Sequence, residues 1–350
     1  MTTYVYVAAQ DDDRVSIFTM DESSGALALQ SEVDIAGGPS LLALSQDKST
    51  LYVGHRSSAQ ISSHRVDPAT GGFTQTGMVD TQDSPTYIVQ DRTGKHLLCS
   101  FYQGARVAVF PLGGDGSVGG EATSSLATDD GAHSIMTDRS NRFAYVPHIA
   151  YQQDNVLEPP KNIPGPNVIY QLRFDEATGT LSGNDPLTLE MDPLVGPRHL
   201  ITHPNLDIVY FSNEQGCSVS SYRIDGDSGT LSHLQTVATL PEGVSVRNTC
   251  SQIQFTPDAR LLLVPNRGHN SIAAFKVDGE GMLTPAAHVD TEAVPSAFSL
   301  DPSGRFVFAA GSATNRLAAY SVDGGSGAMT ALGAYEVGAR PMSVLTAELG

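Results

Sequence analysis

The chain has 350 residues, 40% of them hydrophobic, and it contains 34 glycines and 20 prolines. This composition is ordinary for a soluble protein with a large core, and its wealth of turn-forming residues favours many short strands over long helices. The formal charge of −18 would repel phosphate backbones and anionic lipid, so it argues against nucleic-acid binding and membrane-surface binding.

Neither the cysteines nor the first residues indicate export. Cys99, Cys217 and Cys250 are odd in number and show no CxxC spacing, so they predict neither a disulfide framework nor a zinc site. The N-terminal residues run into a strand pattern without a secretory signal, and no apolar run reaches transmembrane length. We therefore expect a cytoplasmic protein.

In chain order, the sequence repeats a unit of roughly 45–50 residues, which is the size of a propeller blade. Its clearest landmark is a tight turn in which an Asp is followed by Ser or Thr, a Gly and an apolar residue. Glycine supplies the positive φ that such turns need, and the Asp side chain can bond the nearby backbone. The turn occurs at Asp21–Gly25, Asp67–Gly71, Gly113–Ser117 (a degenerate copy), Asp175–Gly179, Asp225–Gly229, Asp278–Gly281 and Asp323–Gly327.

Apolar and polar residues alternate between the turns, which predicts half-buried antiparallel strands. The repeats divide the chain into blades at 38–81, 83–128, 131–191, 195–242, 248–292 and 293–338. A seventh blade is split: 339–350 supplies only an innermost strand, and 2–36 supplies the remaining three. We therefore predict one all-β domain over 1–350, a seven-bladed propeller of four-stranded antiparallel blades. Pairing of the C-terminal innermost strand with the N-terminal strands would close the ring.

This fold brings residues from all blades to one mouth of the central channel. The positions that start each innermost strand form a start ring, and those that follow each second strand form an exit ring. The start ring is Ser40, Thr86, His133, Arg198, Ser251, Ser296 and Met342. The exit ring is Gln10, Arg56, Tyr102, Glu214, Arg267 and Ser312, with His148 one place earlier in the third blade. Such convergent polar groups are typical of ligand sites.

The third blade carries the one long insertion, Ala150–Asn167, directly after the strand that ends near His148. A long loop at a channel mouth is more often functional than neutral, and the prolines in this one make it stiff. We interpret it as a wall or lid over the site.

The ring residues have both a catalytic and a structural interpretation. Glu214 is the best candidate acid/base, with His148 and His133 as further catalytic candidates, although Glu214 could form only a structural ion pair with Arg198. Arg198 and Arg267 present donor forks for a carboxylate or an oxyanion, although each could instead bond neighbouring blades. The histidines could likewise bond between blades. His199, Arg56 and Tyr102 complete the candidate substrate-binding set, and the last two could also belong to a solvated rim.

Two segments carry a specific family resemblance: Gly196-Pro-Arg-His-Leu200 with Tyr210-Phe-Ser-Asn-Glu214, and Pro265-Asn-Arg-Gly-His-Asn-Ser-Ile272. They resemble the seven-bladed propeller lactonases, the family of the bacterial propeller-type 6-phosphogluconolactonases and the fungal carboxymuconate-lactonizing enzyme. The resemblance implies Arg198, Glu214 and Arg267 as site residues, and His148 matches a histidine that the muconate enzyme uses.

We therefore expect a metal-independent lactonase without a cofactor, which acts on an anionic or sugar-derived lactone. One alternative is a cycloisomerase that opens or closes a lactone on a muconate-like diacid. A second is a non-catalytic propeller that binds a protein and shows an exposed apolar patch at the mouth. Since a closed propeller has no free sheet edge that demands a partner, a monomer is the default expectation.

Overall fold

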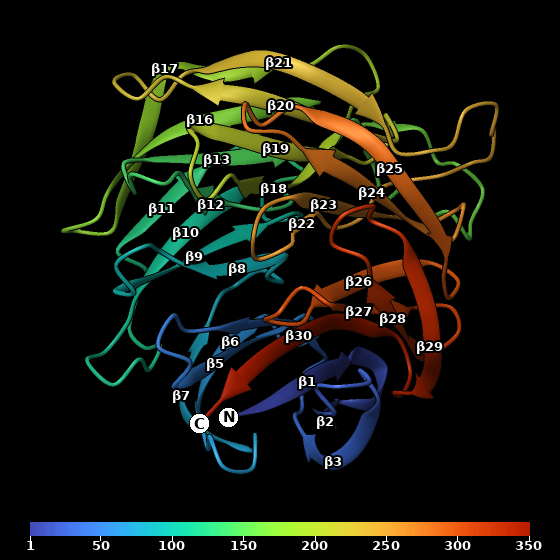
Figure 1. Ribbon diagram of the computed structural model, residues 1–350. Helices are drawn as coiled ribbons and strands as arrows, with labels where there is room; N and C mark the ends of the chain where they lie inside the picture. Colours follow the sequence, from blue (N-terminus) through green and yellow to red (C-terminus); the bar gives the residue numbers. More distant parts are fainter.

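A computed structural model describes residues 1–350 and shows seven four-stranded antiparallel sheets arranged around a central axis (Figure 1). The predicted seven-bladed propeller is thus confirmed. One short 3-10 helix, η1 (Gln10–Asp12), follows the first strand. No helix in the structure is both long enough and apolar enough to cross a bilayer.

The blades are numbered in chain order, and the strands of each are given from the axis outward. Blade 1 contains β4 (Pro39–Leu44), β5 (Thr50–His55), β6 (Gln60–Val66) and β7 (Phe73–Asp80). Blade 2 contains β8 (Tyr87–Gln90), β9 (His96–Phe101), β10 (Arg106–Pro111) and β11 (Ser124–Ala127). Blade 3 contains β12 (Met136–Thr137), β13 (Phe143–His148), β16 (Val168–Asp175) and β17 (Thr180–Glu190). Blade 4 contains β18 (Pro197–Thr202), β19 (Ile208–Asn213), β20 (Ser218–Ile224) and β21 (Leu231–Ala238).

Blade 5 contains β22 (Gln254–Phe255), β23 (Leu261–Asn266), β24 (Ser271–Val277) and β25 (Leu283–Asp290). Blade 6 contains β26 (Pro295–Leu300), β27 (Phe306–Gly311), β28 (Arg316–Val322) and β29 (Met329–Glu336). Blade 7 contains β30 (Pro341–Leu349), β1 (Thr2–Ala9), β2 (Arg14–Met20) and β3 (Leu27–Asp34). A separate two-stranded hairpin, β14 (Tyr151–Gln152) with β15 (Ile163–Pro164), forms from the insertion in blade 3.

The two chain ends close the ring as the sequence predicts. β30 pairs antiparallel with β1 from Thr2↔Leu349 to Ala9↔Pro341, and the two termini lie side by side in Figure 1. This pairing completes blade 7 with strands from opposite ends of the chain. It also removes the sheet edges that an open ring would expose.

The repeated Asp–Gly turns join the third and fourth strands of the blades through one set of contacts. In blade 7 the Asp21 carbonyl accepts a hydrogen bond from Gly25 N at 2.8 Å, and Asp21 Oδ1 accepts bonds from Ser23 N and Ser24 N. Gly25 has φ +72°, and an added Cβ there would collide with the Phe306 ring of blade 6. The glycine is therefore required by both the turn and the neighbouring blade.

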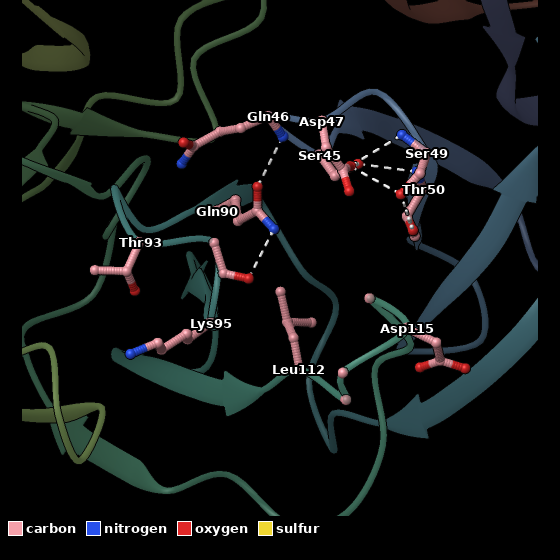
Figure 2. A pocket seen from close by; sticks show the side chains of 14 residues that line it. Ser45, Gln46, Asp47, Ser49, Thr50, Gln90, Thr93, Lys95, Leu112 and Asp115 are labelled. Carbon is pink, nitrogen blue, oxygen red and sulfur yellow. Dashed lines mark hydrogen bonds between the residues drawn. The ribbon is translucent and has the colours of Figure 1, made fainter.

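On the opposite face from the predicted mouth, polar turns link the first and second strands. In blade 1, Asp47 Oδ1 accepts hydrogen bonds from Ser45 Oγ at 2.6 Å and Ser49 N at 3.0 Å (Figure 2). Gln90 of the next blade bonds the backbone of Gln46 and Gly94. These contacts stabilise the turns and tie neighbouring blades together.

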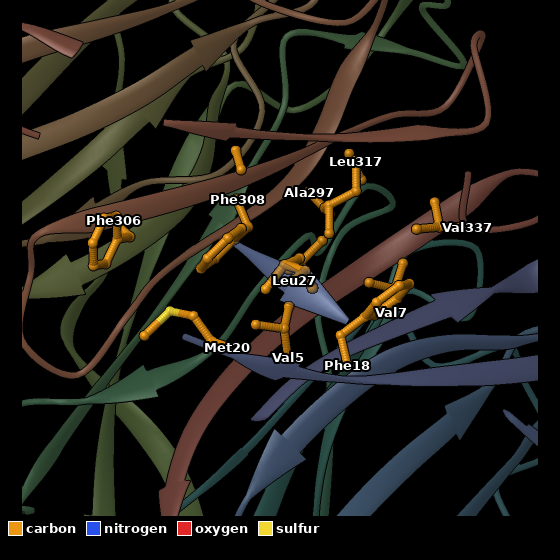
Figure 3. Packing of buried hydrophobic residues seen from close by; sticks show 13 residues of the cluster. Val5, Val7, Phe18, Met20, Leu27, Ala297, Phe306, Phe308, Leu317 and Val337 are labelled. Carbon is orange, nitrogen blue, oxygen red and sulfur yellow. The ribbon is translucent and has the colours of Figure 1, made fainter. Parts of the chain in front are cut away.

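The hydrophobic core consists of clusters between neighbouring blades. One of them, between blades 6 and 7, packs Val5, Val7 and Phe18 against Phe306, Phe308 and Leu317 (Figure 3). Because each blade buries both of its faces in this way, the blades hold the strand ends at the channel mouth in fixed positions.

Buried tyrosines add a repeated polar contact between blades. Tyr6, Tyr52, Tyr145 and Tyr210 occupy the same position of the second strand in four blades, and each hydroxyl donates to a glycine carbonyl of the following blade. The acceptors are Gly71, Gly116, Gly229 and Gly281, at 2.7–2.9 Å.

Candidate active site

Arg198 reaches the channel mouth because of an irregularity in β18. Pro197 pairs with Asn213 and His199 pairs with Ser212, so Arg198 is the extra residue of a β-bulge. Bulges bend a strand and redirect a side chain, and here the bulge lies at the start of the innermost strand. Gly196 precedes it with φ +63°, and an added Cβ there would collide with Gln215.

Glu214 is fixed between blades 4 and 5 by its own backbone. It follows the end of β19; its N–H donates to Gly196 O at 2.6 Å, and its carbonyl accepts from Cys250 N at 3.1 Å. The residue is only 4% exposed. The carboxylate is therefore held by the strands rather than by a flexible loop.

The two predicted arginines each form an ion pair with one oxygen of the Glu214 carboxylate. Arg198 Nε lies 2.8 Å from Glu214 Oε2, and Arg267 Nη2 lies 2.7 Å from Glu214 Oε1. Arg267 Nη2 also donates to Cys250 O at 3.1 Å. The arginine side chains keep 11% and 13% of their area accessible, so the trio is sheltered without being sealed from solvent. The structure thus brings these three side chains together, as the sequence predicts.

The trio has donors left over for a ligand. No hydrogen bond within the protein uses Arg198 Nη2 or Arg267 Nη1, and neither atom is among the fully buried unpaired ones, which include Arg198 Nη1 and Arg267 Nε. Burial and the nearby charge of Arg267 lower the pKa of Arg198 to about 9, so its guanidinium stays protonated at neutral pH. Buried polar atoms are almost always bonded in native proteins, and unpaired donors beside a carboxylate therefore mark a place for a polar ligand.

His133 lies next to the trio in the start ring. Its imidazole is 5.8 Å from the Tyr102 ring and 5.1 Å from the His199 ring, measured between centroids, and its Nδ1 has no partner. Burial and the charge of Arg198 hold the pKa of His133 well below its usual value. The ring is therefore neutral at neutral pH.

Arg56 and Tyr102 occupy the exit ring on the other side of the mouth. Arg56 forms no ion pair within 4 Å, and its charge contributes to lowering the pKa of Arg198. Burial and the charge of Arg340 lower the pKa of Arg56 itself. Burial also raises the pKa of Tyr102 to about 12, so this phenol remains neutral. The mouth thus concentrates positive charge in a strongly acidic protein.

The insertion lies at the mouth beside these residues. Its Gln153 N–H donates to Tyr102 Oη at 3.1 Å, and Gln215 Nε2, next to Glu214, donates to Tyr151 O at 3.3 Å. An ion pair of 2.5 Å between Arg247 and Asp154 ties the hairpin to the loop that precedes blade 5. The hairpin therefore spans from blade 2 to blade 5 along one side of the site.

Comparison with known proteins agrees with this geometry. Residues 2–346 match the family described as lactonase, 7-bladed beta-propeller. The chain belongs to the seven-bladed propeller lactonase family. It is similar to 6-phosphogluconolactonase from Pectobacterium carotovorum (strain PC1), with 32% identity over 98% of both chains. It is also similar to the enzyme of that name from Erwinia tasmaniensis, with 31% identity over 100% of both chains. Among solved structures, the periplasmic gluconolactonase of Pseudomonas aeruginosa matches with a TM-score of 0.88 and 23% identity over 100% of both chains.

His148 does not join the cluster of Arg198, Glu214 and Arg267. Along β13, Ala144 and Val146 face blade 2, and alternation of side chains sends His148 to the same side. Its Nδ1 lies 3.1 Å from Val146 O, and its ring stacks 4.8 Å from Tyr170. The equivalent position of the exit ring is taken by Ile149.

His199 and Tyr87 are polar residues that line the channel below the mouth. Sequence analysis placed the first of them at the mouth and did not single out the second. His199 lines the central channel, one step below the mouth, rather than the mouth itself. Tyr87 lines the channel too, with its ring 5.3 Å from that of His199. One feature of the sequence could have identified Tyr87 as a channel residue: it directly follows Thr86 of the start ring. It therefore lies on an innermost strand, where side chains can face the axis.

A cavity of about 430 Å³ lies on the face opposite the channel mouth, between the turns of blades 1 and 2 (Figure 2). Its polar side chains bond the turns that carry them, as Ser45, Asp47 and Gln90 do. It contains no arginine and nothing like the Arg198–Glu214–Arg267 arrangement. The channel mouth therefore remains the candidate active site of the lactonase.

Proposed function

We propose that this lactonase hydrolyses a phosphorylated sugar-acid lactone, the class for which its 6-phosphogluconolactonase relatives are named. The observation that carries the proposal is the Glu214 carboxylate held between two arginines that keep unpaired donors. Such a site combines a base, an oxyanion-binding group and an anion-binding group within one opening. Lactone hydrolysis uses the first two, and a phosphorylated substrate adds the need for the third.

The positive charge at the mouth favours an anionic substrate. Arg56, Arg198 and Arg267 outnumber the one glutamate among them, whereas the whole chain carries a charge of −18. A guanidinium binds phosphate through paired N–H donors in a fixed plane. Arg56, which has no carboxylate partner, is the residue we assign to the phosphate.

In the proposed reaction Glu214 accepts a proton from water, and the resulting hydroxide attacks the carbonyl carbon of the lactone ring. A carboxylate has about four lone-pair positions, so two contacts with arginine leave room for the water. The unpaired donors of Arg198 and Arg267 stabilise the oxyanion of the tetrahedral intermediate. As the ring C–O bond breaks, protonated Glu214 returns the proton to the leaving alkoxide, directly or through the neutral His133, which gives the free hydroxy acid.

The proposed chemistry is independent of metal. No group of three or more His, Cys, Asp or Glu side chains is placed to hold an ion, and the one carboxylate of the trio has both oxygens in contact with guanidinium groups. Since hard cations require oxygen ligands, these arginines occupy the place that a cation would need. Turnover should be unchanged after dialysis against EDTA.

The decisive experiment replaces Glu214 with Gln. We expect the Glu214→Gln variant to fold and to lose roughly 10²–10⁴-fold in kcat on 6-phosphogluconolactone, the usual range for general acid–base catalysis. Glu336→Gln, on an outer strand with its side chain 81% exposed, is the matched control. Full activity of Glu214→Gln, with spontaneous hydrolysis subtracted, would exclude this role.

A cycloisomerase remains the second candidate, because two arginines with spare donors also suit a substrate with two carboxylates. In that reaction the Glu214 proton would pass to or from carbon. The two candidates separate when muconate lactones are assayed beside sugar lactones in D₂O. Deuterium in a new C–H bond of the product would identify the cycloisomerase.

A further inference from the structure

The central channel directly below the mouth contains a cavity with a chemistry opposite to that of the mouth. It has a volume of about 250 Å³, and 13 of the 18 residues that line it are hydrophobic. The inner strands, among them β8, β18, β26 and β30, surround it (Figure 1). No Asp, Glu, Lys or Arg lines it, although three arginines lie at the mouth above.

Several of the polar groups that line this cavity are already committed to the scaffold. Gln254 donates to Phe298 O at 2.9 Å and accepts from Leu300 N at 3.3 Å. Ser343 Oγ accepts from Leu42 N at 3.1 Å. These side chains join neighbouring inner strands, so they are explained by the ring itself.

Tyr87 and His199, in contrast, have polar groups that are not bonded to the scaffold. Neither the Tyr87 hydroxyl nor the His199 imidazole has a hydrogen-bond partner in the protein, and both residues line the cavity. His199 is 8% exposed, and the two rings meet edge to face at 5.3 Å. Neither polar group is among the fully buried unpaired atoms of the protein. Both therefore remain accessible from the cavity and are suited to bond a ligand that enters it.

The pair also connects the cavity to the active site. His199 stacks 5.1 Å from His133, which lies beside Arg198 at the mouth. A ligand in the channel would therefore lie directly below the proposed catalytic groups.

We propose that the channel is a binding site for a small, uncharged, largely hydrocarbon molecule with one hydroxyl group, such as a benzyl alcohol. The ring would lie against the aliphatic lining, and the hydroxyl would bond Tyr87 and His199. The volume fits, because an apolar protein cavity of roughly 150 Å³ holds a benzene ring. A cationic ligand is disfavoured, since no carboxylate lines the cavity to offset its loss of water and the charges of Arg198 and Arg267 reach His199 in the lining.

The site stands without the proposed function, because binding requires no turnover. If the proposed function also holds, the channel extends the substrate range to lactones that carry a hydrocarbon substituent. The substituent would point down the channel while the lactone ring stays at the mouth.

Titration calorimetry with benzyl alcohol tests the proposal. A ligand of this size is expected to bind with a Kd of roughly 1 mM or tighter, with a negative heat-capacity change that marks apolar burial. Benzylamine, which is charged at neutral pH, should bind at least tenfold more weakly. Absence of saturable binding by benzyl alcohol would overturn the proposal.

Three variants locate the binding. Tyr87→Phe should weaken benzyl alcohol about fivefold to tenfold, the equivalent of one hydrogen bond, and leave toluene unchanged. Ala43→Phe and Leu345→Phe each place a ring in the cavity and should abolish binding of both probes. The two filling variants lie on different strands, so the loss of one to misfolding leaves the other informative. Tyr4→Phe, far from the channel with its hydroxyl bonded to Ala69 O, is the matched control.

Wild-type affinity in the folded filling variants, or equal effects of Tyr87→Phe and Tyr4→Phe, would show that the probe binds elsewhere. Glu214→Gln should bind benzyl alcohol normally even though it lacks turnover. Failure of the channel site and failure of the proposed hydrolysis are therefore distinguishable.

Discussion

At the scale of single residues, the site depends on which arginines have a partner inside the protein. Arg198 and Arg267 share Glu214, whereas Arg56 has no carboxylate within 4 Å and yet lies close enough to influence Arg198. Arg56 is only partly exposed, and an unpaired arginine in such a place is costly unless it binds something. This contrast separates residues that act on the lactone ring from one that binds the distant anionic group.

The first prediction concerns Arg56. The variant Arg56→Met keeps an unbranched apolar side chain and removes its charge, so we expect KM for the phosphorylated lactone to rise at least tenfold, the equivalent of one lost charge-assisted hydrogen bond. KM for unphosphorylated gluconolactone should stay within about twofold. Steady-state kinetics on both substrates measure the difference, with the exposed Arg65→Met as control. A parallel rise for both lactones would remove Arg56 from the phosphate site.

His148 shows why single residues are harder to predict than the ring. Its place at the end of the second strand, one residue before the exit-ring position, is visible in the sequence, but the side to which it points depends on the register of β13 with β16. A shift by one residue reverses every side chain of a strand. Glu214 and Arg267 were easier, because both follow a strand that ends in Asn at the same position.

At the scale of strands and turns, the sequence was most informative. Each Asp–Gly turn imposes a backbone conformation that few residues tolerate, so its spacing marks the blades in the sequence alone. The bulge at Arg198 was not predictable, because bulges depend on pairing across strands rather than on local residue preference. Tyr87 was missed for a similar reason: β8 is only four residues long and carries no motif.

The contact between Tyr145 and Gly229 predicts a measurable coupling between blades 3 and 4. The tyrosine is fully buried and donates at 2.9 Å, so Tyr145→Phe leaves a buried carbonyl without its partner. We expect a loss of about 1–2 kcal/mol in the free energy of unfolding, read from urea denaturation. Tyr151→Phe, on the partly exposed hairpin, should change stability by less than about 0.5 kcal/mol. Equal stability of Tyr145→Phe and the wild type would show that the contact contributes nothing.

The hairpin of the insertion gives a prediction about dynamics. Arg247→Met breaks the ion pair with Asp154 and the bond to the Glu158 carbonyl, and the hairpin itself contains only two short strands. We expect faster amide hydrogen exchange across residues 151–164, with little change in global stability, because partly exposed ion pairs contribute about 0–1 kcal/mol. Arg139→Met, which breaks an exposed pair with Asp207 on the opposite face, should leave this exchange unchanged. Unaltered exchange in Arg247→Met would mean that other contacts hold the hairpin.

At the scale of the whole molecule, closed packing between blades buries histidines in their neutral form. Burial lowers the pKa of six of the ten histidines, to about 4 for His64 and His148 and well below the usual value for His133 and His199. The unfolded chain takes up protons near pH 6.5, where the folded chain does not. Stability is therefore complete above pH 6.5 and is lost as the pH falls from 6.5 toward 4. Turn aspartates such as Asp21, whose pKa its serine bonds lower to about 2, add a second loss between about pH 4 and 2.

The last prediction concerns the contribution of one histidine, His148, to this pH dependence of stability. Phe101 occupies in blade 2 the strand position that His148 occupies in blade 3, and both are fully buried, so His148→Phe should fit the space between blades. Because one pKa unit corresponds to about 1.4 kcal/mol, the wild type should lose about 3 kcal/mol through His148 between pH 6.5 and 4, and the variant should not. Denaturant unfolding at pH 8, 6 and 5 gives the slope of stability with pH. The slope reports how many more protons the unfolded chain binds than the folded chain. This number should fall by close to one in His148→Phe and stay unchanged in His233→Asn, which alters an exposed histidine. Identical slopes in all three proteins would mean that His148 is protonated in the folded ring, stabilised there by the nearby charge of Asp129.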